Sequence, residues 1–230
     1  MTAPAPFRLT YSTMFNPPAE LHRHFDEALQ RVRAQFGRDY PLWPTGQSRD
    51  GHGGSGKVDL HEVRSPIDRN WLLARFAVAT AADVDAAVQA ARDASRGWAA
   101  TPWLERVKLL RRAAALIEER VYDISAVVAL EVGKNRMESI GEVQETADLI
   151  TWYCDQMERN EGFDRRLPDD PLEGFVSRNR TVLKPYGAWA VIAPFNFPVA
   201  LSGAPIAASL VTGNRSSSRL RATPPGAAGC

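Results

Sequence analysis

Cysteine and histidine are scarce in this chain, which limits the disulfide and metal chemistry that it can contain. Only two cysteines, Cys154 and Cys230, occur among the 230 residues, and their dissimilar settings predict no disulfide framework. His22 and His24 stand two residues apart, so on a helix they point to different faces, and no acidic or cysteine partner accompanies them at ligand spacing. We therefore expect no metal site.

Long apolar runs are also missing. The segment from Trp189 to Leu210 is broken by Pro194, Pro198 and Pro205, so it does not provide the roughly 20 continuous apolar residues that span a bilayer. The N-terminus lacks the basic stretch followed by an apolar run that marks a secretory signal. We expect a cytoplasmic protein without a membrane span.

Charge of neither sign is in excess. The chain has 28 Lys and Arg residues against 27 Asp and Glu, a net charge of +1, which is a weak footprint for nucleic acid. Its 44% hydrophobic content is sufficient for a sizeable core, in one large or two modest domains. We expect a globular protein with no nucleic-acid partner.

The Gly-rich segment from Gln47 to Lys57 contains the opening of a phosphate-binding P-loop pattern. The next residue is Val58, which has no hydroxyl for magnesium, and neither a buried strand before it nor a helix after it is evident. We interpret this segment as a flexible connection that ends an N-terminal arm and linker of residues 1–62.

Helical periodicity dominates the first two thirds of the chain. Thr80 followed by Asp83 is a capping signal for one helix, and Thr101-Pro102 opens the next. Asp123 is expected to cap a third, and Cys154 lies on the apolar stripe of a fourth, where a small buried hydrophobe is the usual state. Together with an N-terminal helix, the predicted helices cover about 18–37, 80–98, 101–121, 123–133 and 137–159.

Three segments favour strands. Residues 71–78 are strand material, and residues 175–184 alternate enough to suggest a strand outside the main sheet. The third segment, from Trp189 to Ala193, is free of charge and follows Tyr186-Gly187. It is typical of a parallel strand that is covered on both faces.

Asn196 follows this third strand closely, after the chain breaks at Pro194. Ligands of open α/β sheets bind at the carboxyl ends of strands, and the amide of Asn196 can donate hydrogen bonds there. Asn196 is therefore a candidate oxyanion stabiliser. The alternative is an ordinary turn residue, because Asn tolerates unusual backbone angles and bonds its own backbone.

The motif around Asn196 resembles a known family. Ala-Pro-Phe-Asn-Phe-Pro from Ala193 to Pro198, followed by small residues up to Asn214, is similar to the strand, turn and helix of the aldehyde dehydrogenase superfamily. Val132-Gly133-Lys134 and the helix from Arg106 to Arg120 fit the same family. The resemblance implies an α/β protein with a partial, truncated aldehyde dehydrogenase fold, in which residues 63–214 form a Rossmann-like cofactor domain with a helical N-terminal layer.

The resemblance also implies roles for the residues of this motif. Asn196 would donate its amide to the carbonyl oxygen of an aldehyde while a cysteine thiolate attacks the carbon. The backbone of Ile192, Ala193, Pro194 and Phe195 would lie along the nicotinamide of NAD or NADP, which accepts the hydride. No Gly-x-Gly-x-x-Gly fingerprint follows the strand, so the cofactor is implied by the family alone.

Within the superfamily, residues 131–135 and 141–148 and the N-terminal arm look closest to the branch that oxidises glutamate semialdehyde, 1-pyrroline-5-carboxylate dehydrogenase. Glu142 and Glu145 share a helix face that could approach a substrate tunnel and attract an amino group. The alternative is that both are solvated helix charges. In the same family, the strand near Thr181 to Lys184 belongs to an oligomerisation sheet, which implies a homo-oligomer.

A cluster of basic residues also has two possible interpretations. Four basic side chains occur close together in the second predicted helix. They could bind phosphate or an acidic partner, or they could simply form the solvent-exposed face of an amphipathic helix. We favour the interpretation as a solvent-exposed helix face. The group comprises Arg106, Lys108, Arg111 and Arg112.

The family's catalytic cysteine and general-base glutamate lie far beyond the Asn motif, whereas this chain ends at Cys230. We therefore expect the chain to be inactive. Two alternatives remain: a non-catalytic fragment that binds a partner or oligomerises, and an acylating, coenzyme-A-dependent enzyme with the same Cys and Asn chemistry.

The last segment, residues 215–230, departs from the family in character. At this point the family continues with a strand resembling Thr-Val-Val-x-Lys-Pro, but the chain reads Arg-Ser-Ser-Ser-Arg-Leu. With permitted codons, a one-base shift converts the latter into Thr-Val-Val-Lys-Pro-Ala, which predicts a frameshift. The alternative is a genuine basic tail whose Arg215, Arg219 and Arg221 touch nucleic acid.

Overall fold

The computed structural model describes residues 16–42 and 59–219 of the chain. The linker expected at 47–57 and the end of the tail, from residue 220, lie outside the described residues. The helices are α1 (Ala19–Arg33), α2 (Ala81–Ala100), α3 (Trp103–Glu119), α4 (Val121–Val132), α5 (Arg136–Arg159) and α6 (Ala200–Val211), with a 3-10 turn η1 (Glu161–Phe163). The strands are β1 (Arg38–Tyr40), β2 (Leu60–Arg64), β3 (Leu72–Ala77), β4 (Asp164–Arg166), β5 (Arg180–Val182), β6 (Ala188–Ile192) and β7 (Arg215–Arg219).

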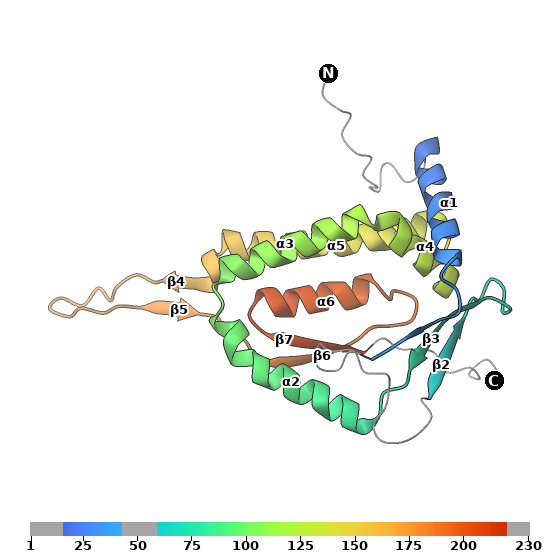
Figure 1. Ribbon diagram of the computed structural model, residues 1–230. Helices are drawn as coiled ribbons and strands as arrows, with labels where there is room; N and C mark the ends of the chain where they lie inside the picture. The colour runs from blue at the N-terminus through green and yellow to red at the C-terminus, as the bar shows by residue number, and fades with distance from the viewer. Residues whose placement is uncertain (1–15, 43–58, 220–230) are drawn as a thin grey trace, which may run out of the picture.

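These elements form stacked layers. Helices α3 and α5 run side by side, α6 lies beneath them, and a parallel sheet of β6 and β7 separates α6 from α2 (Figure 1). A parallel sheet with helices on both faces is the arrangement of α/β proteins, because each element buries one apolar face against the next layer. The predicted α/β class is confirmed.

The five predicted helices are all present, with shifted ends. Thr80 and Asp83 form the predicted capping box of α2, in which Asp83 N donates to Thr80 Oγ1 at 3.3 Å and Thr80 N donates to Asp83 Oδ2 at 2.9 Å. Helix α1 ends at Arg33, before Gly37 adopts a φ of 75°, and the residues that follow form β1. β1 pairs in parallel with β3, whose partner on the other side is β2.

The prediction that Asp123 caps a helix is wrong. Arg120 is the N-cap residue of α4, and Asp123 lies in its first turn. Its carboxylate instead accepts a hydrogen bond from Arg31 Nε of α1 at 2.9 Å. Asp123 thus links the N-terminal helix to the helical layer.

The core lies between α3, α5 and α6. Cys154 is fully buried in it, as its place on the apolar stripe predicted. Among the described residues, no helix combines the length and apolar character needed to cross a bilayer. The buried members of this core are Val107, Leu110, Ala114, Ala147, Ile150, Cys154, Met157, Ala207 and Val211.

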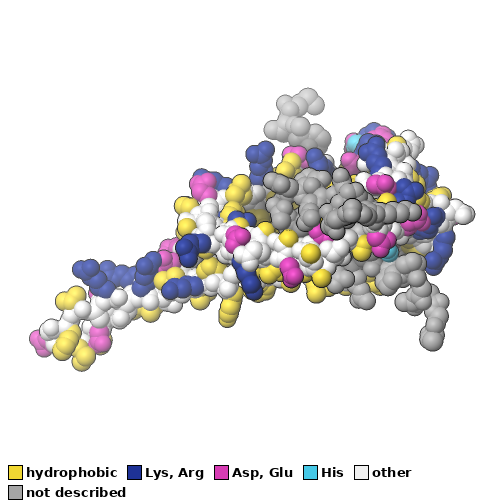
Figure 2. Space-filling view, turned by 60° about the horizontal axis from the view of Figure 1, so that its bottom comes forward, with side chains coloured by type: hydrophobic (Ala, Val, Ile, Leu, Met, Phe, Trp, Pro, Cys, Tyr) yellow, Lys and Arg dark blue, Asp and Glu magenta, His cyan; other side chains and the backbone are white. Residues whose placement is uncertain are grey.

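The predicted strand at 175–184 is shorter than expected, because only Arg180–Val182 pairs, antiparallel with β4. The two strands make a separate sheet, and their connection projects from the body as an arm (Figure 1). Lys and Arg side chains gather along this arm, and hydrophobic side chains gather at its tip (Figure 2). The exposed apolar residues of the connection are Leu167, Leu172, Phe175 and Val176.

Strand β6 is much less buried than the sequence predicts, although helices lie on both faces of its sheet. Val191 in the strand and Ala193 just after it are buried, whereas Trp189 is 45% and Ile192 68% exposed. Within the described residues β6 has one neighbouring strand, β7, so the structure leaves its other edge open. Sequence composition identified the strand correctly but could not show how much of it is covered.

The first five residues of the expected tail form an ordered strand. β7 pairs in parallel with β6 from Ala188 opposite Arg215 to Ile192 opposite Arg219. The Ser216 hydroxyl is buried and has no hydrogen-bond partner in the described part of the chain. A polar side chain at Ser216 therefore occupies a site that normally takes an apolar one.

Candidate active site

The candidate site is the turn between β6 and α6. β6 ends at Ile192, α6 begins at Ala200, and Asn196 is exposed between them, at the carboxyl end of the strand as predicted. No group of residues 16–42 and 59–219 forms a hydrogen bond to the Asn196 side chain. Its amide is therefore open to a ligand.

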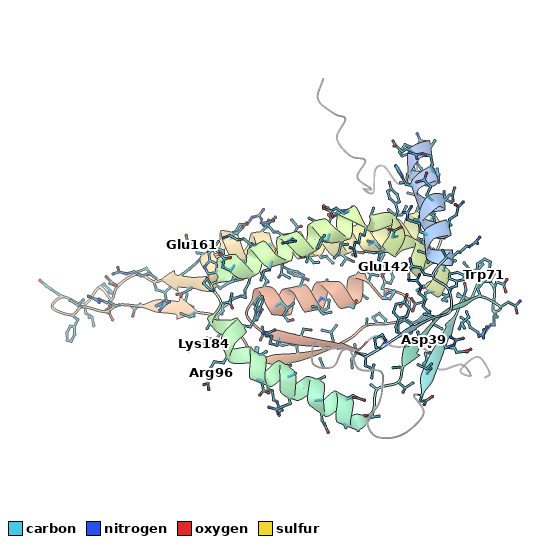
Figure 3. The ribbon with its side chains drawn as sticks, viewed as in Figure 1. Asp39, Trp71, Arg96, Glu142, Glu161 and Lys184 are labelled. Atoms are coloured by element: carbon cyan, nitrogen blue, oxygen red, sulfur yellow. The ribbon has the colours of Figure 1, made fainter. Side chains whose placement is uncertain are left out.

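A buried carboxylate supports this turn from α5. The Glu142 side chain is 0% exposed, and its Oε1 accepts hydrogen bonds from Val199 N at 2.8 Å and Ala200 N at 3.3 Å. These are first-turn amides of α6, which have no partner inside their own helix, and Val199 supplies no side-chain cap. A carboxylate at a helix N-terminus is also favoured by the helix dipole (Figure 3).

Lys134 completes this arrangement. Its Nζ donates to Glu142 Oε2 at 2.6 Å and lies 3.5 Å from the ring centroid of Phe197, the residue next to Asn196. The Lys134 side chain is only 12% exposed. The sequence marked Lys134 as part of a family motif but gave no signal that it would reach the Asn196 turn.

Glu142 and Glu145 lie three residues apart on α5, as expected, but they differ in accessibility. Glu142 is buried under the start of α6, so it is neither solvated nor open to a substrate, whereas Glu145 is exposed. The helical spacing was correct, but α6 covers one side chain and leaves the other free. Of this pair, only Glu145 stays a candidate for contact with a substrate.

The segment expected to contact the cofactor is accessible at its end. Ile192 is 68% and Phe195 60% exposed, and Pro194 is exposed between them, whereas the Ala193 side chain is buried. The exposed side chains at the carboxyl end of β6 are therefore all uncharged.

Cys154 cannot serve as the nucleophile of this site. It lies inside the helical core, and its Sγ is 3.8 Å from the Val107 carbonyl oxygen. Burial raises the pKa of its thiol, and the carboxylates of Glu158 and Asp155 raise it further, while Arg111 lowers it. A thiol held protonated is a poor nucleophile.

The prediction that the basic residues of α3 are solvent-exposed is wrong for Arg106. Its side chain is buried, with Nε donating to the Val211 carbonyl at 2.9 Å and Nη1 donating to the Thr101 carbonyl. Burial lowers the pKa of this guanidinium. Arg106 thus closes the C-terminus of α6, whereas Lys108 and Arg112 are exposed as expected.

His22 contacts a neighbouring helix, whereas His24 pairs within α1. His22 Nδ1 lies 2.8 Å from Arg136 Nη1, and His24 Nε2 lies 3.4 Å from Glu20 Oε1. Over residues 16–42 and 59–219, no group of three or more His, Cys, Asp or Glu side chains is placed to hold a metal ion.

Comparison with known proteins decides the family. The sequence pattern of the aldehyde dehydrogenase family matches residues 54–218, which extends into β7. The chain belongs to the aldehyde dehydrogenase family. The family predicted from the Asn196 motif is therefore confirmed.

The relatives of this aldehyde dehydrogenase chain include several 1-pyrroline-5-carboxylate dehydrogenases. The Staphylococcus epidermidis protein is 32% identical over 210 residues, which cover 91% of this chain and 38% of the relative. The Geobacillus sp. (strain WCH70) protein is 32% identical over 195 residues, or 83% of this chain and 35% of the relative. The chain thus spans well under half the length of these relatives and matches their N-terminal part.

Solved structures agree with these relatives. The 1-pyrroline-5-carboxylate dehydrogenase from Thermus with bound NAD has a TM-score of 0.78 and 32% identity, covering 95% of this chain and 40% of that one. Proline utilization A from Bdellovibrio bacteriovorus has a TM-score of 0.75 and 26% identity, covering 85% of this chain and 19% of that one. The partial aldehyde dehydrogenase fold is confirmed.

Proposed function

We propose that this chain provides the N-terminal part of an NAD(P)-dependent 1-pyrroline-5-carboxylate dehydrogenase, which oxidises glutamate semialdehyde to glutamate in proline breakdown. The observation that supports this most is the exposed, unengaged amide of Asn196 at the carboxyl end of β6. An amide in that place stabilises an aldehyde oxygen as negative charge develops on it.

The residues before Asn196 fit the proposed cofactor. NAD or NADP supplies the hydride acceptor when bound. Ile192, Pro194 and Phe195 would line its nicotinamide from one side, because all three are exposed beside Asn196. The 32% identity to the Thermus enzyme, whose structure holds NAD, supports this assignment.

Glu145 is the proposed contact for the substrate's amino group. It is exposed on α5, three residues along from the carboxylate that braces the turn. An anionic side chain there would attract the ammonium group of glutamate semialdehyde. In an active form of the protein, Glu145→Gln should raise KM and leave kcat largely unchanged, as expected for a residue that binds substrate away from the reacting atoms.

The 230-residue chain itself is proposed to be inactive. The part of the chain that the structure describes contains one cysteine, and that thiol is buried in the helical core with a raised pKa. The test is formation of NADH or NADPH, followed by absorbance, from purified chain with 1-pyrroline-5-carboxylate and NAD or NADP respectively. Turnover above the protein-free rate would contradict the proposal.

The frameshift hypothesis is supported by the conflict between the sequence and the location of β7. With the codons assumed for residues 215–220, restoring the shifted frame would place Val at position 216, where the serine hydroxyl is now buried without a partner. Resequencing the gene across the codons for residues 210–230 tests this directly. A confirmed reading frame with no family sequence downstream in any frame would refute the hypothesis.

A gene with the restored frame would permit the decisive assay. There, Asn196→Ala should lower kcat by about 10²–10³-fold, the usual loss for one oxyanion donor. Asn70→Ala is the matched control, because Asn70 is an exposed turn residue outside the site. Equal activity of the two variants would exclude Asn196 from the chemistry.

One observation favours the alternative of an oligomerising fragment. Phe175 and Val176 at the end of the arm are 73% and 90% exposed, and Figure 2 shows hydrophobic side chains gathered there. Exposed apolar patches usually mark contact surfaces. Light scattering on the purified chain should then give a mass above 25.4 kDa, and Phe175→Glu should reduce it. A single monomer peak would count against this alternative.

A further inference from the structure

We infer that Glu142 and Lys134 are positioning residues that hold the Asn196 turn in place from the helical layer. Their functional meaning rests on the role proposed for Asn196, but the contacts themselves do not. Lys134, just after α4, contacts the Phe197 ring, and Glu142 of α5 accepts a hydrogen bond from Val199 N. Because Lys134 also donates to Glu142, the two residues together hold the second half of the turn.

The burial of Glu142 makes its location costly to change. Its side chain is 0% exposed, and a buried carboxylate is tolerated only when it is paired and hydrogen-bonded. Its two oxygens have different partners: Oε1 accepts from the amides of α6, and Oε2 accepts from Lys134. Any displacement of the α6 N-terminus would therefore leave both the buried Oε1 of Glu142 and the helix amides without partners.

Lys134 connects the same anion to the residue beside Asn196. Its ammonium group lies 3.5 Å from the centroid of the Phe197 ring, a favourable contact of a cation with an aromatic face. Phe197 is 37% exposed, so its other neighbours leave part of the ring open to solvent. Lys134 thus restrains Phe197 while it neutralises Glu142.

Asn196 depends on these neighbours because its own side chain is exposed and unengaged among the described residues. Catalytic groups need supporting contacts that hold them within a fraction of an ångström of the productive geometry. Phe197 and Val199, one and three residues beyond Asn196, are the held points of this turn. The pair therefore orients the amide without touching it.

The test compares a buried pair with an exposed one. Lys134→Met leaves the Glu142 carboxylate without its cation, Lys134→Arg keeps the charge, and Phe197→Leu removes the ring while leaving the pair intact. The matched control is Lys108→Met, because Lys108 pairs with Glu105 at 2.7 Å on the exposed surface of α3. Each change is made in the full 230-residue chain.

The measurement is amide hydrogen exchange over residues 195–201, with residues 107–114 of α3 as the internal reference, together with the NMR signals of the Asn196 side-chain amide. Local opening sets exchange rates, so exchange reports on the turn itself. Lys134→Met and Phe197→Leu should speed exchange in the turn by about tenfold or more, relative to α3, and shift the Asn196 signals. Lys134→Arg should restore most of the protection, and Lys108→Met should change nothing.

Two results would overturn the inference. One is unchanged exchange at 195–201 in both Lys134→Met and Phe197→Leu. The other is an equal rise in α3, since a purely global loss of stability would produce that. Neither result bears on the role proposed for Asn196, which is tested separately by Asn196→Ala in the restored enzyme.

Discussion

Replacing Ser216 should stabilise this protein, because the residue is half-buried but its hydroxyl oxygen is buried without a partner. Its hydroxyl is buried in β7 opposite Trp189 of β6 and has no hydrogen-bond partner within the described residues. A buried, unpaired hydroxyl costs about 1–3 kcal/mol. Ser216→Ala removes that cost without breaking a bond, so the free energy of unfolding should rise by about 1 kcal/mol. Ser216→Val, the residue of the shifted frame, should add to this by burying more apolar surface, at about 0.8 kcal/mol per methylene.

Urea unfolding provides the assay. With a denaturant slope of about 1–3 kcal/mol per molar for a protein of this size, a gain of 1 kcal/mol moves the midpoint up by roughly 0.3–1 M at an unchanged slope. Ser209→Ala is the matched control, because Ser209 is also buried but donates to the Ile206 carbonyl at 2.8 Å. Its loss should cost about 0.5–1.5 kcal/mol, the opposite sign.

The reasoning would be refuted if Ser216→Ala lowered the urea midpoint, as Ser209→Ala is expected to do. That result would mean that the Ser216 hydroxyl has a partner in solution. It would also remove the structural support for the frameshift, because a satisfied serine is no anomaly in this strand.

Three further predictions concern the helical layers. Gly203→Ala should destabilise by about 1–3 kcal/mol, because its Cβ would lie 2.6 Å from Thr146 Cγ2, and Thr146→Ser should restore most of the loss in urea melts. Thr80→Ala should cost about 0.5–2 kcal/mol by removing the cap of α2, and an unchanged melt would mean that the cap is not formed. Burial raises the thiol pKa of Cys154, so in a Cys230→Ser background its contribution to stability should be complete below the unfolded thiol pKa of about 8.5 and be lost as pH rises toward the folded value. Cys154→Ala should lack this pH dependence.

The positions of the helices could be predicted because they depend on patterns within a few turns. Thr80 and Asp83 are three residues apart and form their capping box independently of the rest of the chain. The apolar stripe through Cys154 likewise identified a core residue, since any helix with that spacing must bury it. Asp123 was misassigned because the same residue type can pair with a distant cation, here Arg31.

Exposure of the sheet could not be predicted from composition. The segment from Trp189 to Ala193 has the uncharged character of a strand covered on both faces, yet Ile192 is 68% exposed. Covering depends on which neighbouring strands and helices are present, and those lie far away in the chain. β7 shows the reverse case, because a Ser-rich sequence forms a strand where β6 offers it backbone partners.

The sequence by itself determined the family, the α/β class and the location of Asn196 on a turn after a strand, because each follows from a local motif or period. Only the tertiary structure decided the roles of Glu142 and Arg106, two charged residues that the sequence placed on helix faces open to solvent or ligands. Both are buried at the two ends of α6, where Glu142 accepts from its first amides and Arg106 donates to its last carbonyl. The reason is physical: a helix leaves unpaired backbone groups at its ends, and the side chains that satisfy them are chosen by packing in space and not by distance along the chain.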